Sequence, residues 1–167
     1  MLTLRAPEQN DVDRIFLWEN DPGLFEVLPN AAPLSRLQVW DYIQNYNADP
    51  FSTHELRQMI VEDDSGDTVG YIDLFEFDTI NHRAGIAIYI DEEFRCRGYG
   101  RQSLEILERY AIQTLALHQL WAIVAIDNEP SRRLFTSAGF KPAGRLRSWL
   151  RRRSQYTDAL ILQKLFA

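Results

Sequence analysis

The spacing of apolar residues changes at one glycine-containing loop, Arg95-Cys96-Arg97-Gly98-Tyr99-Gly100-Arg101. Along residues 83–90, before the loop, apolar side chains alternate as they do in a half-buried strand. Along residues 98–117, after the loop, they recur every three or four positions, as in an amphipathic helix. The apolar run at 120–126 then has the pattern of a strand buried on both faces of a parallel region. This order predicts a strand–loop–helix–strand crossover and therefore a mixed α/β (α+β) domain.

The other elements are predicted from capping and turn signals. Ser35 and Gln38 form a capping box, and Asp64-Ser65-Gly66-Asp67 is a strong hairpin turn. We expect helices at 11–20, 35–46 and 130–138, a loop or broken helix at 22–33, and strands at 58–62, 68–77, 142–150 and 156–165. The sum is a central mixed sheet of about six to seven strands flanked by about four helices.

Length and composition favour one domain, residues 1–167, that buries an ordinary core, since 46% of the 167 residues are hydrophobic. No stretch approaches the roughly 20 apolar residues of a membrane helix, and residues 1–10 lack the apolar run of a signal peptide. We therefore expect a cytoplasmic protein with no membrane partner. Cys96 is the only cysteine, which excludes an internal disulfide and argues against a cysteine-based zinc site, so no metal is expected.

Charge is divided unevenly along the chain, although the net charge is only −6. The part before Arg95 has 19 acidic and 5 basic residues, a net −14, and the rest has 5 acidic and 13 basic residues, a net +8. Such an asymmetry indicates partners of opposite charge: a polyanion for the basic half and a cationic amine for the acidic half. The alternative is two solvated faces whose compositions differ by chance.

The loop at 95–101 has the features of an anion site. A helix N-terminus exposes unpaired N–H groups and the positive end of the helix dipole, and glycines there let the backbone approach a phosphate. The loop lacks the Gly-Lys-Ser/Thr ending of a Walker loop and the three-glycine spacing of a dinucleotide fingerprint. On its own, the loop therefore predicts an anion-binding helix start.

Two motifs extend this interpretation to a known family. Arg95-x-x-Gly98-x-Gly100 resembles the Q/R-x-x-G-x-G/A acyl-CoA signature of the GNAT acetyltransferase superfamily. Asn128-x-x-Ser131-x-x-Leu134-Phe135-x-x-x-Gly139-Phe140 resembles the second motif of that family, at the right spacing around the buried strand. Residues 154–158 resemble the closing segment of the ribosomal-protein-alanine and spermidine (diamine) acetyltransferases. The resemblance extends over residues 2–165, more loosely in the N-terminal third.

The resemblance implies a GNAT-like fold and an acetyl-CoA-dependent N-acetyltransferase without a metal. Its acceptor would be a small (poly)amine or a protein or peptide N-terminus. Backbone amides of 96–101 would hold the pyrophosphate, a strand edge would pair with pantetheine, and the second motif would contact the pantetheine arm and the outer part of the cofactor. The cofactor-binding candidates are Ile88, Tyr89, Ile90, Arg95, Cys96, Arg97, Gly98, Tyr99, Gly100, Arg101, Asn128, Ser131, Arg133 and Phe135, with Arg132 as an alternative to Arg133.

Two of these positions depart from the family pattern. Cys96 replaces a glycine that is common there, and its backbone can serve if φ stays negative. Phe135 stands where many members have a tyrosine that protonates the leaving thiolate. Arg97 and Arg101 would add phosphate contacts, or would be ordinary solvated residues at a helix start.

The proton requirements of the reaction indicate that a base matters more than an acid. Deprotonating an alkyl amine of pKa about 10.4 at pH 7 costs roughly 4–5 kcal/mol, whereas releasing a thiolate of pKa about 8.5 costs about 2 kcal/mol. Water or a hydroxyl such as that of Tyr99 or Tyr156 could therefore replace the missing tyrosine. The alternative is a non-catalytic acyl-CoA-binding domain, a sensor or interaction module, for which Phe135 is the main argument.

Asp73 and Glu76 are the candidate bases, because in the family this strand faces the cleft. Alternation puts Asp73 on one face with Tyr71, Phe75 and Phe77, and Glu76 on the other with Ile72 and Leu74. The alternative for Asp73 is an ion pair with Arg83. Relatives often have an acid at the position of Gly85, and its absence shifts the expectation to Asp73 and Glu76.

Three other features each have a functional and a structural interpretation. Tyr156 would hydrogen-bond the acceptor, or would simply pack in its strand. His82 has a suitable ordinary pKa but lies in an expected turn, where a surface histidine is commoner. The arginines at 151–153 are expected to be a solvated tip, and nucleic acid is not an expected partner. A homo-oligomer of two or more copies stays open.

Overall fold

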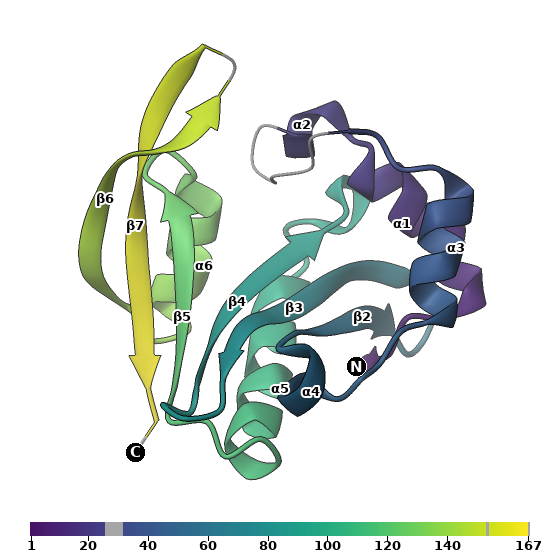
Figure 1. Ribbon diagram of the computed structural model, residues 1–167, viewed down its shortest axis with the longest axis horizontal. Coiled ribbons are helices and arrows are strands. Elements are labelled where there is room, and N and C mark those ends of the chain that lie inside the picture. The colour runs from purple at the N-terminus through teal and green to yellow at the C-terminus, as the bar shows by residue number, and fades with distance from the viewer. Residues whose placement is uncertain (26–31, 153, 167) are drawn as a thin grey trace.

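The computed structural model describes residues 1–25, 32–152 and 154–166, which form a seven-stranded sheet in the order β1-β2-β3-β4-β5-β7-β6 (Figure 1). Only β4 and β5 run parallel, and all other neighbours are antiparallel. The predicted mixed sheet of six to seven strands is therefore confirmed. The strands are β1 Leu2–Arg5, β2 Leu56–Glu62, β3 Thr68–Asp78, β4 Arg83–Ile90, β5 Gln119–Ala125, β6 Lys141–Arg152 and β7 Gln155–Leu165.

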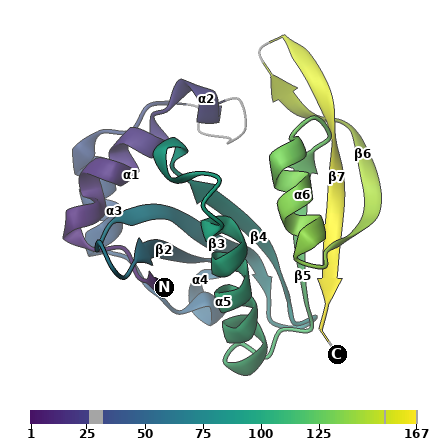
Figure 2. The same cartoon turned by 180° about the vertical axis from the view of Figure 1, so that it is seen from behind.

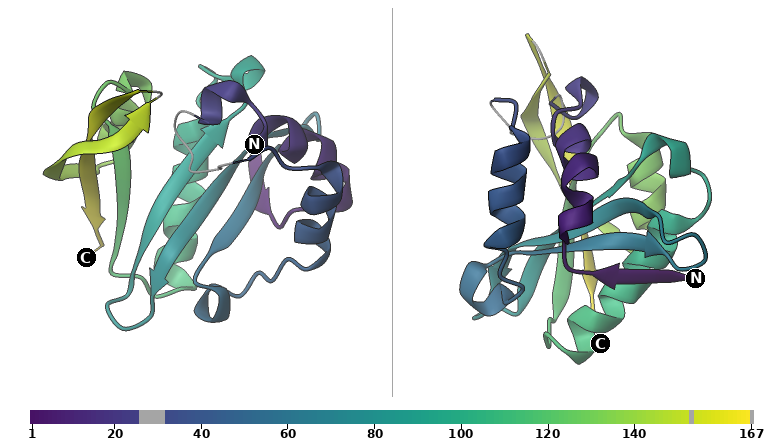
Figure 3. Two further views of the ribbon diagram at one scale, coloured as in Figure 1. Left: turned by 45° about the horizontal axis from the view of Figure 1, so that its top comes forward. Right: turned by 90° about the vertical axis from the view of Figure 1, so that its right-hand side faces the viewer.

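Helices cover both faces of the sheet. Figure 2 shows α5 and α6 in front of one face, and the right-hand view of Figure 3 shows α1 and α3 on the opposite side from α5. The helices are α1 Val12–Glu19, α2 Pro22–Phe25, α3 Arg36–Gln44, α4 Pro50–Thr53, α5 Tyr99–Gln113 and α6 Glu129–Ser137, with 3-10 turns at Gln9–Asp11 and Glu92–Phe94.

Most of the predicted elements are confirmed, including the Ser35–Gln38 capping box. Strand β1 and the single-turn helix α4 were not predicted, because four residues are too few to show a period. The expected loop or broken helix at 22–33 begins with α2, but its middle, including Glu26, lies outside the described residues, as does Arg153.

Strands β4 and β5 pair over only three residues. Arg83, Ala84 and Gly85 lie opposite Gln119, Leu120 and Trp121, after which β4 continues beside β3 and β5 beside β7. The two halves of the sheet therefore diverge beyond Gly85, as Figure 1 shows. Within the described part of the chain, backbone groups on the facing edges of β4 and β5 beyond this point pair with no other strand.

Two cores hold the helices on the sheet. The larger core packs α5 and α6 against one face, with Leu104 and Leu107 of α5 fully buried over Ile72 and Leu74 of β3. Burying such a side chain stabilises the fold by roughly 1.5–3 kcal/mol. The smaller core packs α1 and α3 against the other face through Ile15, Trp18, Val39, Met59 and Tyr71. Alternation along β3 thus assigns Tyr71 and Asp73 to the α1 face and Ile72 and Leu74 to the α5 face.

A bulge near the end of β3 interrupts this alternation. The pairing with β4 shifts between Phe75 and Asp78, and Glu76 has a φ of 47°. Because the bulge adds a residue, Phe77 turns into the larger core with Leu74, whereas Glu76 is exposed. The expectations that Phe77 shares a face with Asp73, and that Glu76 shares one with Leu74, are therefore wrong.

Candidate functional site

The loop before α5 presents a row of unpaired N–H groups. Among the hydrogen bonds between described residues, none uses a backbone N–H from positions 96–101. Cys96 and Gly98 have φ values of 61° and 81°, in the left-handed region, and α5 starts at Tyr99. Left-handed residues before a helix start turn successive N–H groups toward one concave side, which favours an anion. The condition of a negative φ at Cys96 is not met, and the left-handed turn explains why glycine suits this position.

The arginines of the loop fold back onto the protein. Nε of Arg95 donates to the carbonyl of Ile90 at 3.0 Å, and Nη2 of Arg97 donates to the carbonyl of Glu93 at 2.9 Å. Nε of Arg101 donates to Glu105 at 2.7 Å, and its Nη1 donates to the carbonyl of Ser137 at the end of α6. All three arginines are exposed, so they surround the N–H groups with positive charge. Their contacts with phosphates stay a prediction.

Gly100 brings the start of α5 close to α6. A Cβ at this position would lie 3.2 Å from Cδ2 of Leu134 and 4.0 Å from Cδ1 of Ile88. The N–H loop therefore lies directly beside β4 and α6, on the side of the sheet that these helices cover (Figure 2).

Only part of the predicted strand edge faces the divergence of β4 and β5. The N–H of Asp91 donates to Val69 of β3, and a Cβ on Gly70 of β3 would meet the carbonyl of Tyr89. Backbone groups alternate along a strand, so Tyr89 faces β3 while Ile88 and Ile90 face β5. Two of the three residues expected to pair with pantetheine are thus available, and the carbonyl of Ile90 already accepts from Arg95.

Asn128 is the N-cap of α6. Its Oδ1 accepts from the N–H of Ser131 at 3.2 Å, and among the described contacts its amide Nδ2 has no partner. The side chain can therefore cap the helix and still donate one hydrogen bond to a ligand.

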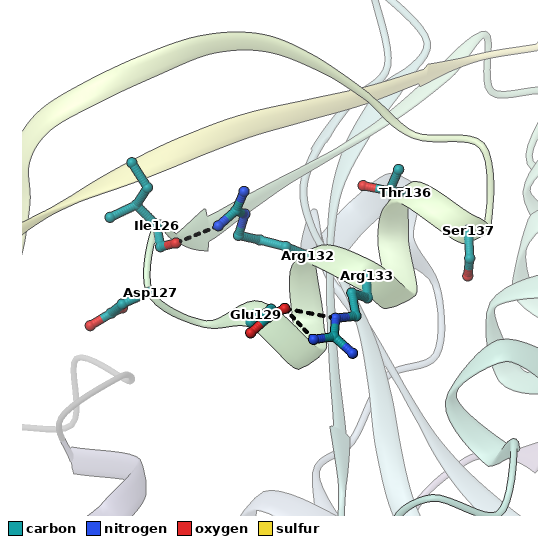
Figure 4. A pocket seen from close by; sticks show the side chains of 7 residues that line it. All are labelled: Ile126, Asp127, Glu129, Arg132, Arg133, Thr136 and Ser137. Carbon is teal, nitrogen blue, oxygen red and sulfur yellow. Dashed lines mark hydrogen bonds and ion pairs between the residues drawn. The ribbon is translucent and has the colours of Figure 1, made fainter.

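A pocket of about 580 Å³ lies against α6. Figure 4 shows Arg132 and Arg133 pointing to different sides of this helix. Nη1 of Arg132 donates to the carbonyl of Ile126 at 2.8 Å, and Nε of Arg133 donates to Glu129 at 3.0 Å. Arg132 thus stabilises the loop between β5 and α6, whereas Arg133 forms an exposed pair within the helix. The lining residues are Ile126, Asp127, Glu129, Arg132, Arg133, Thr136 and Ser137.

The hydroxyl groups suggested as proton donors lie in different surroundings. Phe135, at the usual tyrosine position, is 2% exposed, and its ring centroid is 5.0 Å from that of Phe140. The hydroxyl of Tyr99 donates to the carboxylate of Glu62, and this hydrogen bond raises the pKa of Tyr99. Tyr156 is 64% exposed near the tip of the β6–β7 hairpin. The structure therefore brings none of these residues into contact with Asp73.

Asp73 forms an ion pair with Arg57, a residue that sequence reasoning missed. Nε and Nη2 of Arg57 donate to the two carboxylate oxygens at 2.9 and 2.7 Å, and Nη1 donates to Glu19 at 2.8 Å. The proposed pairing of Asp73 with Arg83 is wrong, because Arg83 lies at the strand end and pairs with Asp78 at 3.1 Å. The register set by the turn, with Val61 opposite Thr68, would place Leu56 opposite Asp73; a one-residue shift between Ile60 and Val61 places Arg57 there instead.

Burial raises the pKa of the Asp73 carboxyl above its ordinary value, although the charge of Arg57 opposes the rise. Glu19 and Glu55 add to the increase through like-charge repulsion. A raised pKa makes this carboxylate a stronger proton acceptor than an exposed aspartate.

Asp73 also lies near the point where β4 and β5 diverge. It faces Ala87 of β4 in the strand register, two residues beyond the last paired position, Gly85. An acid at Gly85 would not fit, because a Cβ there would lie 2.5 Å from the ring of Phe75 and 2.9 Å from that of Trp121. Of the two candidate bases, Asp73 is therefore the one beside the divergence, and Glu76 is exposed on the bulge.

The described residues bring no three His, Cys, Asp or Glu side chains together in an arrangement that could hold a metal ion. In the same part of the chain, no helix is long and apolar enough to cross a membrane.

The chain matches the acetyltransferase (GNAT) domain family over residues 1–141. It is 25% identical to the spermidine N(1)-acetyltransferase of Vibrio cholerae over 145 residues, 87% of this chain and 82% of the relative. It is 35% identical to the putative phosphinothricin acetyltransferase YwnH of Bacillus subtilis over 147 residues, 86% of each chain. A solved structure of the Vibrio cholerae spermidine N-acetyltransferase with CoA and spermine matches with a TM-score of 0.84 at 24% identity, covering 98% of this chain and 95% of that one.

Fold and relatives together define the chain as an acetyl-CoA-dependent N-acetyltransferase that acetylates amines. It belongs to the GNAT acetyltransferase family. The resemblance found in the two sequence motifs is confirmed, and with it the predicted fold and enzyme class.

Proposed function

We propose that the chain acetylates a primary amine of a small polyamine, with the loop at 96–101 holding acetyl-CoA and Asp73 accepting the proton of the amine. The main support is the position of Asp73: a largely buried carboxylate beside the divergence of β4 and β5, on the face opposite α5. The cofactor loop and the carboxylate then approach the same gap from opposite sides of the sheet.

The residues present fit the cofactor. Six consecutive unpaired N–H groups suit a pyrophosphate, and the free edge of β4 at Ile88 and Ile90 suits the amides of a pantetheine arm. Asn128 retains a free donor on the α6 side. When bound, acetyl-CoA supplies a thioester whose carbonyl carbon an amine can attack.

Asp73 would perform the proton transfer that the reaction needs. The acceptor ammonium would first lose one proton to solvent; as its nitrogen bonds the acyl carbon and the carbon–sulfur bond breaks, Asp73 would take the second proton from the nitrogen and the sulfur would leave as a thiolate. With Phe135 at the tyrosine position, the thiolate takes its proton from water. Leaving as a thiolate rather than as a thiol costs about 2 kcal/mol at pH 7 if the pKa of the thiol is near 8.5, which an enzyme can tolerate.

A cationic acceptor is supported by the charge around Asp73. Glu19, Arg57 and Asp73 together have one net negative charge, and their side chains are only 9, 18 and 20% exposed. Residues 1–94, to which these three side chains belong, have a net charge of −14. The spermidine acetyltransferases among the relatives support the same class of acceptor.

Thiol release from acetyl-CoA tests this function against spermidine, spermine, diamines, aminoglycosides and N-terminal peptides. We expect the highest kcat/KM with a polyamine and a large loss in Asp73→Asn. Turnover that prefers a neutral or peptide acceptor would contradict the polyamine assignment. Tight acetyl-CoA binding with no acceptor-stimulated turnover would support the non-catalytic alternative instead.

A further inference from the structure

Arg57 connects three elements of the acceptor side. It extends from β2, pairs with Asp73 on β3 through two hydrogen bonds, and pairs with Glu19 at the end of α1 through a third. Its guanidinium carbon lies 4.1 Å from the ring centroid of Tyr71, so the ring restricts it from one side. A guanidinium with fixed partners on three sides has little freedom to rotate, and neither has the carboxylate that it grips.

The ion pair with Arg57 leaves hydrogen-bond acceptor positions free on the Asp73 carboxylate. An ionised carboxylate has about four acceptor positions, and Arg57 uses one on each oxygen. Among the described residues no other donor contacts Asp73, so about two positions remain for an incoming amine.

The charged and titratable groups around Asp73 come from every neighbouring element. Glu19 extends from α1, Glu55 precedes β2, Arg57 lies on β2, and Tyr71 lies on β3. Tyr42 of α3 and Tyr46, two residues beyond the end of that helix, also contribute, and burial raises the pKa of both, which keeps them neutral. Arg57 is thus the one cation in this set, and it opposes two carboxylates and the effect of burial on Asp73.

We propose that Arg57 is a positioning residue of the acetyl transfer, which orients the Asp73 carboxylate toward the acceptor amine and which Glu19 fixes to helix α1. The inference rests on the proposed function, because it acts through Asp73. It assigns to Arg57 an effect on the reaction that a purely structural ion pair would not have.

The pH profile of kcat/KM tests this role. Activity falls on the acidic side as Asp73 becomes protonated. We call this fall in kcat/KM at low pH the acidic limb. In Arg57→Met the favourable charge is gone and the pKa of Asp73 rises, so the acidic limb moves to higher pH by about 1–3 units. In Arg57→Lys the charge remains but the two-pronged grip is lost, so the limb moves less while kcat still falls at least about tenfold. Because Arg57→Met leaves two carboxylates without their cation and can fail to fold, Arg57→Lys is sufficient for the test.

Glu19→Gln provides a test in the opposite direction. Removing this negative charge lessens the repulsion on Asp73, so the acidic limb moves to lower pH while kcat falls through looser positioning of Arg57. A double variant gives a further check: in the Asp73→Asn background, Arg57→Lys should lower kcat/KM by less than twofold, because the residue through which it acts is already absent.

The Arg5–Asp11 pair is a matched structural control. It has the same two-pronged geometry, with distances of 2.7 and 3.0 Å, and links β1 to the turn before α1. Arg5→Lys should lower the melting temperature and leave the acidic limb unchanged. If Arg57→Lys behaves like Arg5→Lys, with lower stability but an unmoved limb and unchanged kcat, the positioning role is overturned.

The outcomes also separate this inference from the function on which it rests. If Asp73→Asn keeps the wild-type rate and acidic limb, Asp73 is not the base and the proposed function itself fails. If Asp73→Asn loses activity but the Arg57 and Glu19 variants keep the wild-type limb and kcat, only the role of Arg57 fails.

Discussion

Gly100 and Leu134 face each other so closely that a Cβ on the glycine would lie 3.2 Å from a methyl group of the leucine. The first turn of α5 therefore contacts α6 directly, next to the loop whose N–H groups are unpaired. The width of the proposed cofactor site would depend on this contact, since α5 and α6 would form its sides.

Gly100→Val should force Leu134 aside and move the start of α5. Overpacking of this kind costs about 1–3 kcal/mol, so we expect the Kd for coenzyme A to rise about tenfold or more. Calorimetric titration with coenzyme A measures the change. The double variant Gly100→Val/Leu134→Ala restores space and should recover much of the affinity for coenzyme A. If the double variant binds coenzyme A as weakly as the single variant does, this contact does not control the width of the site.

Gly98→Ala should weaken cofactor binding, because an alanine at a φ of 81° is strained and its methyl group borders the N–H row. Gly66 is a control with a similar backbone: its φ is 75°, nothing lies within 4 Å of its Cβ position, and it lies in the β2–β3 turn, outside the loop at 95–101. Both variants should lose about 1–2 kcal/mol of stability, but only Gly98→Ala should raise the Kd for coenzyme A. Equal affinity of the two variants for coenzyme A would contradict the assignment of the loop at 96–101 as the coenzyme A site.

Phe135→Tyr restores the usual tyrosine. If its hydroxyl reaches the thiolate, the gain at pH 7 is limited to about 2 kcal/mol, or roughly thirtyfold in rate, for a thiol of pKa about 8.5. We therefore expect any increase in kcat to shrink as the pH rises from 7 and to vanish above about pH 8.5. The measurement is kcat from pH 6.5 to 9.5 in both proteins. An increase that persists at the highest pH would mean that the tyrosine acts in another way.

Asp11→Asn should reduce stability mainly above acidic pH. Burial alone would raise the pKa of Asp11, but hydrogen bonds from Arg5, Thr68 and the N–H of Glu8 lower it below its ordinary value. The lowered pKa stabilises the fold above the unfolded-state pKa of about 3.9, and this contribution is lost as the pH falls through the folded-state value.

We expect Asp11→Asn to lower the free energy of unfolding by about 2 kcal/mol at pH 7 and by much less near pH 2. Urea denaturation at both pH values measures the difference. Asp41→Asn, a change at an exposed position on α3, is the control and should have little effect at either pH. A loss of equal size at both pH values would contradict a charge-dependent role for Asp11.

Local patterns were enough to predict most of the fold. The alternation before Arg95, the helical period after it and the capping box at Ser35 each involve residues within a few positions, so their physics is visible in the sequence. The same holds for the N–H loop, because a helix start with glycines has the same chemistry wherever it lies. The sign of φ at Cys96, in contrast, is decided by the folded turn, which holds this residue in the left-handed region although it has a side chain.

Contacts between distant residues were decided only by the tertiary structure. Arg57 lies 16 residues from Asp73 and 38 from Glu19, and a one-residue shift in the pairing of β2 with β3 places Arg57 opposite Asp73. The bulge at Glu76 turns Phe77 into the core by the same mechanism.

The two sequence motifs were sufficient to indicate the family and a helix start with exposed N–H groups, because both depend on short-range backbone chemistry. Which carboxylate lies beside the divergence of β4 and β5, and which cation holds it, depended on strand register, bulges and burial that only the folded chain defines.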